Sequence, residues 1–284
     1  MVRKKPYLTI RARHGWVGID MRELWRFREL LFSLTARDVK LRYKQTALGV
    51  IWVVLQPLVA AGIFSMIFGK LADLGSDQTK DGKNIPLFLF TFAGLVAWNV
   101  FFGIITKVSG ILVQNSSLVS KVYFPRVLLP SAGALGVMVD LLVVIVMLLA
   151  MQLITWIGLT PQYLVAPLVL SLIVALSLGI GIWAAALCVE YRDVAYILPV
   201  FMQFLMFGSP VFYSDALAHK FGQYAWVPYL NPLWGLLGAW KWCVLSTPFP
   251  PVWSVIYAGA VSLAFLFAGV MVFRRMERNF ADVI

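Results

Sequence analysis

The stretch that decides the fold is residues 128–156, LLPSAGALGVMVDLLVVIVMLLAMQLITW, in which Asp140 is the one charged residue. About 20 apolar residues are enough for a helix to cross the ~30 Å hydrocarbon core of a bilayer. The apolar residues form a continuous run here and not a stripe along one face, which is typical of a buried or membrane-spanning helix. Residues 128–156 therefore predict a transmembrane helix.

Similar runs lie on both sides of this segment, and together they predict an all-α polytopic membrane protein with six transmembrane helices. The other five runs are at about 47–69, 87–111, 163–189, 196–213 and 252–273. Composition agrees, because 61% of the 284 residues are hydrophobic and only 13% are charged, against about 25% charged in soluble domains. We therefore divide the chain into three regions, namely an N-terminal segment (1–46), a transmembrane domain (47–273) and a tail (274–284).

The distribution of Lys and Arg predicts that both ends of the chain are cytoplasmic. With the N-terminus inside, the inner segments carry 18 of these residues and the outer segments 5. Short cytoplasmic loops are enriched in Lys and Arg. Residues 1–46 are too long and polar to be a secretory signal peptide, so we expect a multi-pass membrane protein that keeps its N-terminus.

Residues 22–44 predict an amphipathic interface helix. Leu24, Phe27, Leu31, Leu34 and Leu41 recur at helical spacing, and polar residues recur between them. Such a helix lies in the membrane interface with its cations near anionic headgroups, and it either serves as a topology anchor alone or also contacts a cytoplasmic partner. Its basic residues are Arg22, Arg26, Arg37, Lys40, Arg42 and Lys44.

Segment 214–251 is too apolar for a simple loop and too rich in Pro and Gly for a full span. Residues 229–245 (YLNPLWGLLGAWKWCVL) are about as long as a short helix pair. We expect a re-entrant helical hairpin on the outer side, because irregular backbone at membrane depth needs protein or water to satisfy it. The alternative is an interfacial helix that lies flat, since Trp and Tyr also gather at interfaces.

The sequence contains no catalytic constellation. Gly69 and Lys70 are followed by Leu71, so there is no P-loop, and neither H-E-x-x-H nor G-x-S-x-G occurs. Cys188 and Cys243 do not have metal-ligand spacing. We therefore expect no enzyme activity, no metal and no cofactor in this chain. Asp140 and Lys107 are the ionisable residues within the spans; Asp140 is either a proton or cation site, or a partner in a structural pair or along a transport route.

Four motifs stand out in the chain. They are RDVKLRYKQTALG (37–49) followed by Trp52 and Gln56-Pro57, GLVAW (94–98) followed by Phe101-Phe102, NSSLVSKVYFPRVLLP (115–130), and YRDV (191–194). In order and spacing they resemble the ABC-2 type permeases, and more narrowly their polysaccharide-export branch, which serves O-antigen, capsule and teichoic acid. The resemblance runs from about residue 22 to the end of the chain, and it implies a protein of the bacterial inner membrane.

The resemblance implies a homodimer that works with two copies of a separate cytoplasmic ATPase subunit, which would bind ATP and Mg²⁺ in place of this chain. It also implies that residues 112–127 form the loop that couples the two subunits; the simpler explanation is a loop made basic by topology alone. Within it we expect a short helix over 116–120. The candidate coupling residues are Ser117, Lys121, Val122, Tyr123, Phe124, Pro125 and Arg126.

The resemblance further implies that a lipid-linked glycan slides through a channel between two permeases. Sliding requires many weak contacts, and the faces of aromatic side chains can supply them. Residue by residue, helix packing or an interfacial belt is the better explanation of each aromatic, and only the set as a whole favours a channel. The candidate channel residues are Trp52, Phe64, Trp98, Phe101, Asp140, Tyr229, Trp234 and Trp240.

The leading hypothesis is the permease of a lipid-linked polysaccharide exporter, and the alternative is an ABC-2 type drug or lipid exporter. An ion-coupled secondary transporter would show an inverted repeat and several intramembrane charges. A membrane glycosyltransferase would show carboxylate clusters, and 112–127 contains none.

Overall fold

The computed structural model describes residues 25–44, 51–71, 79, 82–122, 124–158, 160–214, 218 and 222–277. Throughout these residues the repeating secondary structure is helical. The longer helices are α2 (Arg28–Lys44), α3 (Ile51–Met66), α4 (Leu87–Ser109), α7 (Leu128–Ile154), α8 (Ala166–Glu190), α9 (Val194–Phe207), α11 (Pro232–Leu245) and α12 (Val252–Met276). The shorter ones are the π-helical turn Ile67–Leu71, α5 (Ile111–Gln114), α6 (Ser116–Lys121) and the 3₁₀ turns Pro161–Val165, Gly222–Tyr224 and Pro228–Leu230.

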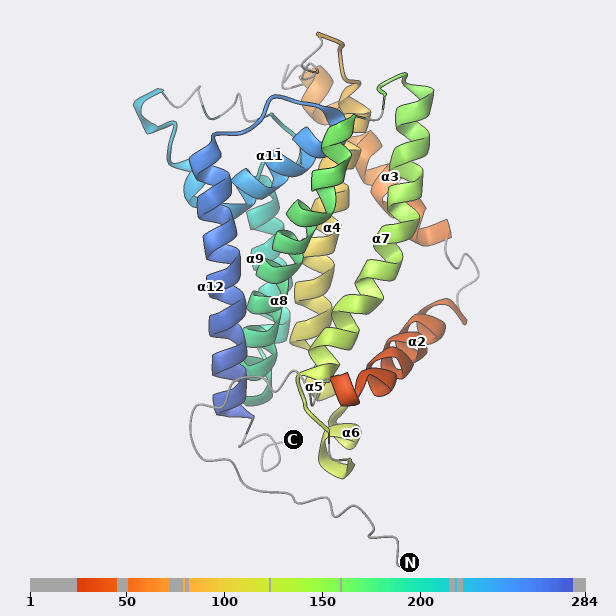
Figure 1. Ribbon diagram of the computed structural model, residues 1–284, viewed down its shortest axis with the longest axis vertical. Helices are drawn as coiled ribbons and strands as arrows, with labels where there is room; N and C mark the ends of the chain where they lie inside the picture. Colours follow the sequence, from red (N-terminus) through yellow and green to blue (C-terminus); the bar gives the residue numbers. More distant parts are fainter. Residues whose placement is uncertain are drawn as a thin grey trace, which may run out of the picture.

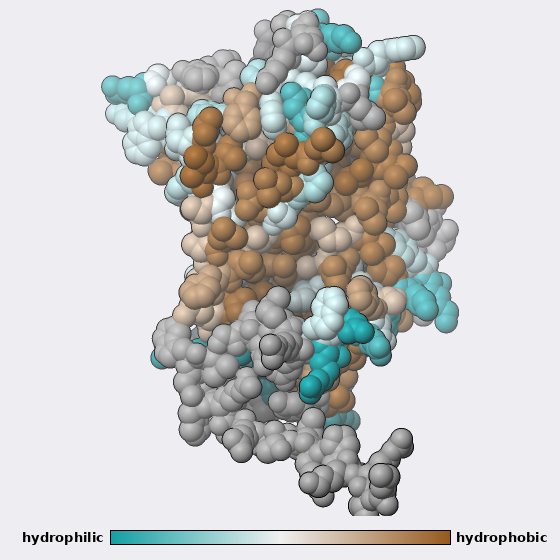
Figure 2. Space-filling view, viewed as in Figure 1, coloured by the Kyte–Doolittle hydropathy of each residue, from teal (hydrophilic) through white to brown (hydrophobic). Residues whose placement is uncertain are grey.

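Five helical segments are long and apolar enough to cross a membrane, namely Ile51–Gly69, Leu87–Ser109, Leu128–Ile154, Pro161–Glu190 and Val252–Met276. Each coincides with a run predicted from the sequence. The chain is therefore a multi-pass membrane protein. Its visible surface has a broad apolar band between two more hydrophilic ends (Figure 2).

The run at 196–213 is the exception, so the prediction of six full spans is not confirmed. Helix α9 has 14 residues and spans ~21 Å at about 1.5 Å per residue, short of the ~30 Å core. It ends where Gly208, Ser209 and Pro210 turn the chain. The side chains of Asn231 and Trp234 donate hydrogen bonds to the Gly208 carbonyl oxygen, at 3.2 and 3.0 Å. The start of α11 therefore holds the end of α9.

Helix α4 forms the centre of the bundle and is buried along most of its length. It packs against α3, α7, α8, α9 and α11. The most extensive contact between the described helices joins α8 to α12. By contrast, only Pro57 and Ala61 are buried in α3, and only Met202 in α9. Helices α3 and α9 thus lie at the periphery of the chain.

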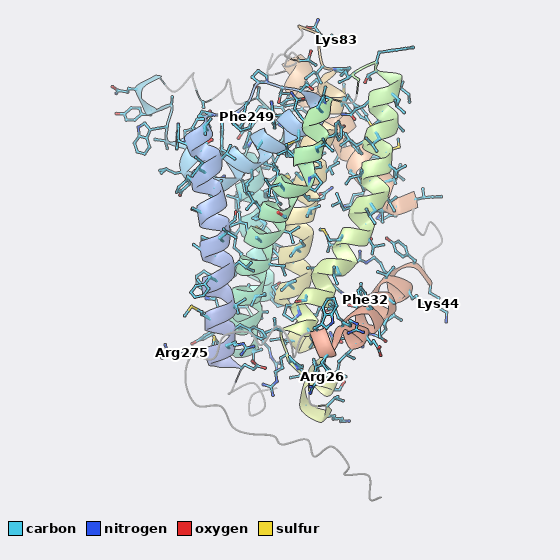
Figure 3. The ribbon with its side chains drawn as sticks, in the orientation of Figure 1. Arg26, Phe32, Lys44, Lys83, Phe249 and Arg275 are labelled. Atoms are coloured by element: carbon cyan, nitrogen blue, oxygen red, sulfur yellow. The ribbon has the colours of Figure 1, made fainter. Side chains whose placement is uncertain are left out.

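The bundle has two distinct ends (Figure 1). Helices α5 and α6, helix α2 and the C-terminal end of α12 lie toward one end, which we call the α6 end. Helix α11 lies at the opposite end, which we call the α11 end. Arg26, Lys44 and Arg275 belong to the α6 end and Lys83 to the α11 end (Figure 3). The three labelled cations that the charge count assigned to the inner side therefore lie at the same end.

Within residues 222–251 the structure has one α-helix, α11, preceded by two 3₁₀ turns, where the sequence suggested a helix pair. Asn231 caps α11 by accepting a hydrogen bond from the Leu233 amide at 3.0 Å, and Pro232 occupies the first turn. Most residues of α11 are buried against α4, α8 and α12. Protein surrounds this helix on most sides, and the re-entrant hairpin stays a prediction.

Candidate functional site

The coupling segment forms two short helices at the α6 end. Helix α6 (Ser116–Lys121) matches the short helix predicted at 116–120. Ser117, Lys121 and Val122 are exposed to solvent, and the exposed fraction of Val122 is 50%. These side chains are available to a partner.

Phe124 and Arg126 face inward, which differs from the expected docking role. Phe124 is only 5% exposed and packs in the core. Arg126 donates a hydrogen bond to the Glu277 carbonyl oxygen at the end of α12, and Pro125 is half-buried between them. Tyr123 lies outside the described residues. The second half of the segment therefore attaches the loop to its own bundle.

Helix α2 and the residue before it pack part of their apolar side chains on the protein. Leu34 is 6% exposed, and Phe27 and Leu31 pack on the same core. These residues were expected to face the membrane interface, but they lie in the core, and α2 packs along the N-terminal half of α7. Leu41, expected on the same face, is 61% exposed. The cations Arg26, Arg37, Lys40 and Lys44 are also exposed, and Arg22 lies outside the described residues.

Asp140 of α7 forms an ion pair with Arg42 of α2 and accepts a hydrogen bond from the Tyr43 hydroxyl. The Arg42 and Asp140 side chains are 35% and 20% exposed. A charge at the bilayer centre costs ~2.5–3.5 kcal/mol on insertion scales, and pairing offsets part of this cost. The contact supports the structural pair among the roles considered for Asp140.

The second charge within the spans is also paired with α2. The Lys107 ammonium of α4 lies 3.5 Å from Asp38 Oδ2. Asp38 Oδ1 in turn accepts from Arg37 at 3.0 Å. Arg37 also donates to the Asn115 side-chain oxygen at 2.9 Å, directly before α6. Polar contacts thus connect α2 with α4, α7 and the start of α6.

Burial, followed by the hydrogen bond to Asp140, raises the pKa of Tyr43 to about 12. The ordinary pKa of tyrosine is about 10, so folding favours the neutral hydroxyl. The resulting stabilisation is fully present below pH ~10 and is lost as the pH rises toward 12. Tyr43 therefore stays a neutral hydrogen-bond donor at physiological pH.

Five of the expected channel aromatics are buried within the chain. Trp98, Phe101, Tyr229, Trp234 and Trp240 are each at most 4% exposed. Trp240 donates to the Ala93 carbonyl oxygen at 2.9 Å, which joins α11 to α4. Burial supports helix packing for these residues rather than contact with a substrate on the surface.

The remaining channel candidates are more accessible. Trp52 of α3 is 54% exposed. Phe64 is half-buried and stacks on Phe212 with ring centroids 3.9 Å apart. An aromatic route on this chain would therefore follow the outward faces of α3 and α9, where Phe201 and Phe204 are also exposed.

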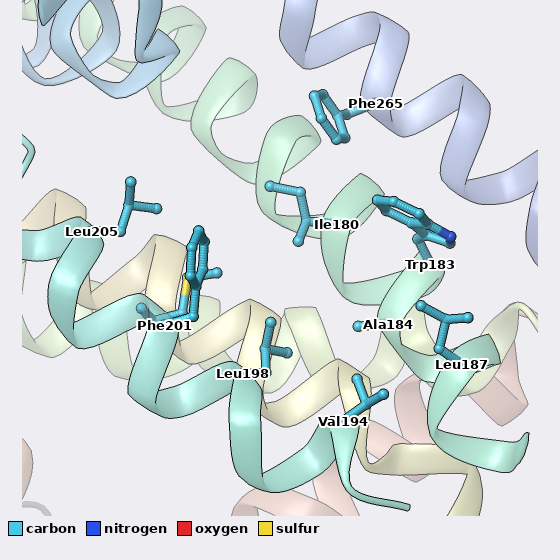
Figure 4. Close-up of a pocket in the computed structure, with 10 residues that line it drawn as sticks. Ile180, Trp183, Ala184, Leu187, Val194, Leu198, Phe201, Leu205 and Phe265 are labelled. Atoms are coloured by element: carbon cyan, nitrogen blue, oxygen red, sulfur yellow. The ribbon is translucent and has the colours of Figure 1, made fainter. Parts of the chain in front are cut away.

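An apolar groove of about 310 Å³ lies between α8, α9 and α12. Trp183 and Ile180 of α8, Phe201 and Leu198 of α9, and Phe265 of α12 surround it (Figure 4). Its lining consists of aliphatic and aromatic side chains and the thioether of Met202, which suits an acyl or isoprenoid chain and not a sugar.

Lys241 of α11 is a buried cation that the sequence reasoning missed. Its side chain is 3% exposed, and its ammonium donates to the carbonyl oxygens of Pro210 and Tyr213 at 2.6 and 3.2 Å. The ammonium also lies 3.8 Å from the ring centroid of Phe90. A lone lysine in an apolar run is the signal for such a site, because a buried charge requires partners.

Comparison with known proteins assigns the chain to a family. Residues 29–240 match the family described as ABC-2 type transporter. This match covers more than half of the chain, and the chain belongs to that family.

The similar curated proteins cover nearly the whole chain. The chain is 24% identical over 265 residues to the O-antigen export system permease protein RfbA of Myxococcus xanthus, which covers 93% of this chain and 98% of the relative. A protein of the same name from Klebsiella pneumoniae is 25% identical over 261 residues, with 90% and 95% covered. The polysialic acid transport protein KpsM of Escherichia coli is 25% identical over 250 residues, with 86% and 92% covered.

Proposed function

We propose that this chain is the permease subunit of an ATP-driven exporter that moves a lipid-linked polysaccharide of the O-antigen kind out of the cytoplasm across the inner membrane. The observation that carries the proposal is the near full-length similarity to permeases named for O-antigen export and to a polysialic acid transport protein. The family match and the five apolar spans support a transport component that is not itself an enzyme.

The α6 end is the cytoplasmic side in this proposal, and we propose that both termini are cytoplasmic. The Lys and Arg excess of the segments found at this end supports the orientation. Two copies of an ATPase subunit would bind here, against Ser117, Lys121 and Val122, and would hold the ATP and Mg²⁺. The exposed cations of α2 would lie near anionic headgroups.

Two copies of the chain would form the channel. The outward faces of α3 and α9 are the least buried of the apolar helices and carry exposed aromatic side chains. Those faces suit a second copy and a glycan that moves between them. The hydrocarbon tail of the carrier would stay in the bilayer, and the apolar groove beside α9 offers it a surface.

Purification of the permease with its cognate ATPase tests this proposal. We expect the two subunits to co-purify and lipid-linked glycan to stimulate ATP hydrolysis. A response to drugs or simple lipids, with none to glycan, would favour the alternative ABC-2 exporter. Failure to bind any ATPase would contradict the proposal.

Two substitutions in the coupling segment should have different effects. Val122→Asp should weaken ATPase binding by ~1–2 kcal/mol, the effect of a contact residue that matters for binding, and leave the permease as stable as before. Phe124→Ala should lower the stability of the permease itself by ~3–5 kcal/mol, because it empties a buried site. Thermal denaturation of the permease alone and the yield of co-purified ATPase distinguish the two.

The control is Lys83→Asp, an exposed substitution at the α11 end. It should change neither property. Normal ATPase binding by Val122→Asp would remove α6 from the proposed interface.

A further inference from the structure

The two ionisable side chains within the predicted spans share one feature, since both are paired with the same helix outside the spans. Helix α2 gives a carboxylate, Asp38, to Lys107 of α4. It gives a guanidinium, Arg42, to Asp140 of α7. Helix α2 supplies the negative charge in the first pair and the positive charge in the second. The two pairs together therefore fix the direction in which α2 lies.

Further contacts extend this pairing along α2. Thr35 is 9% exposed, and its hydroxyl lies 3.5 Å from the Ala132 carbonyl oxygen in the first turns of α7. Arg37 joins Asp38 to Asn115, the residue directly before α6. Helix α2 therefore contacts the second span, the third span and the start of the coupling helix at once.

We propose that α2 is a permanent clasp, defined by Arg37, Asp38, Arg42 and Tyr43, that joins the coupling helix to α4 and α7 throughout the transport cycle. This inference rests on the proposed function, in which an ATPase moves α6. A rigid clasp passes that movement to both spans together. Separation of α2 would expose a carboxylate and an ammonium to an apolar surrounding, which keeps the clasp closed.

The first test removes the charges one at a time. Asp140→Asn, Arg42→Gln and Asp38→Asn should still insert, bind the ATPase and hydrolyse ATP. The amount of glycan exported per ATP should fall roughly tenfold, within the range typical of coupling between sites. The exchanged pair, Arg42→Asp with Asp140→Arg, should recover export relative to either single variant.

Matched controls come from the exposed face of the same helix. Arg28 contacts Trp25 on its own segment, and Glu29 is exposed. Arg28→Gln and Glu29→Gln should export as the wild type does. Wild-type export per ATP in all three neutralised variants would overturn the clasp. If a neutralised variant fails to insert, the exchanged pair provides the comparison, and its failure to recover export would also overturn the proposal.

The second test asks whether the clasp stays closed. Thr35→Cys and Ala132→Cys would be cross-linked by a disulfide or a short thiol reagent, in a chain whose buried Cys188 and Cys243 are replaced by Ala. A permanent clasp predicts export by the cross-linked complex at the rate of the reduced one. Loss of export that returns on reduction would show that α2 must separate, and would overturn the proposal.

Failure of the proposed function would be recognised separately. The wild-type permease would then bind no ATPase, and the proposed coupling role of the clasp would be wrong as well. An active wild-type complex with unaffected variants contradicts the clasp alone.

Discussion

Replacing Gly269 with alanine should destabilise the permease by ~1–3 kcal/mol, the usual cost of extra atoms in a packed interior. A methyl group at Gly269 of α12 would lie 3.0 Å from the carbonyl carbon of Gly179 in α8 and nearer still to its oxygen. Both atoms belong to backbone, so no side chain can rotate away. The two helices would have to separate along the most extensive contact of the described bundle. Small residues allow such close approach between membrane helices.

Thermal denaturation of the purified permease measures this effect, and the same helix provides the control. A methyl group at Gly259 would meet only Leu172 Cδ1, at 3.6 Å, which is ordinary contact. Gly259→Ala should be neutral or should stabilise by up to ~1 kcal/mol through helix propensity. Equal melting temperatures for the two variants would contradict the predicted clash.

Replacing Lys241 with methionine should loosen the turn that follows α9. Methionine keeps the length of the side chain but removes the ammonium that donates to the Pro210 and Tyr213 carbonyl oxygens. An unsatisfied buried polar group costs ~1–3 kcal/mol, and two acceptors lose this donor. The loss of the ammonium over the Phe90 ring adds to the effect. We expect a lower melting temperature and faster proteolysis at residues 208–214.

The matched control is Lys83→Met, which removes an exposed cation at the same end of the molecule. It should leave both measurements unchanged. Lys241→Arg retains the charge and should lose less stability than the methionine variant. A melting temperature of Lys241→Met at or above that of the wild type would show that the buried charge costs more than its contacts contribute.

Sequence and structure agree best where the evidence is local. The spans at α3, α4, α7, α8 and α12 follow from uninterrupted apolar runs, because crossing a bilayer requires only enough consecutive apolar residues. The run at 196–213 was also predicted to span the membrane, but its helix ends early, at the turn that contains Gly208 and Pro210. Its composition alone does not reveal that Trp234 and Asn231 hold the turn.

The candidate site was predicted in part. The short helix at the start of the coupling segment was expected from its position and residues, and α6 is found there. The inward placement of Phe124 was not expected, because an aromatic residue in a loop can either pack inside or project toward a partner. The five buried aromatics of the expected channel illustrate the same ambiguity.

The sequence by itself determined the membrane class, the order of the apolar runs, the basic character of one side and the absence of a P-loop. Each of these depends on consecutive residues or on their count. Only the tertiary structure decided which side chains face inward and which charges meet. Arg42 and Asp140 are separated by 98 positions in the chain, and their contact depends on how α2 and α7 are rotated and packed. That rotation is set by the whole bundle, because the apolar runs have no marked face of their own.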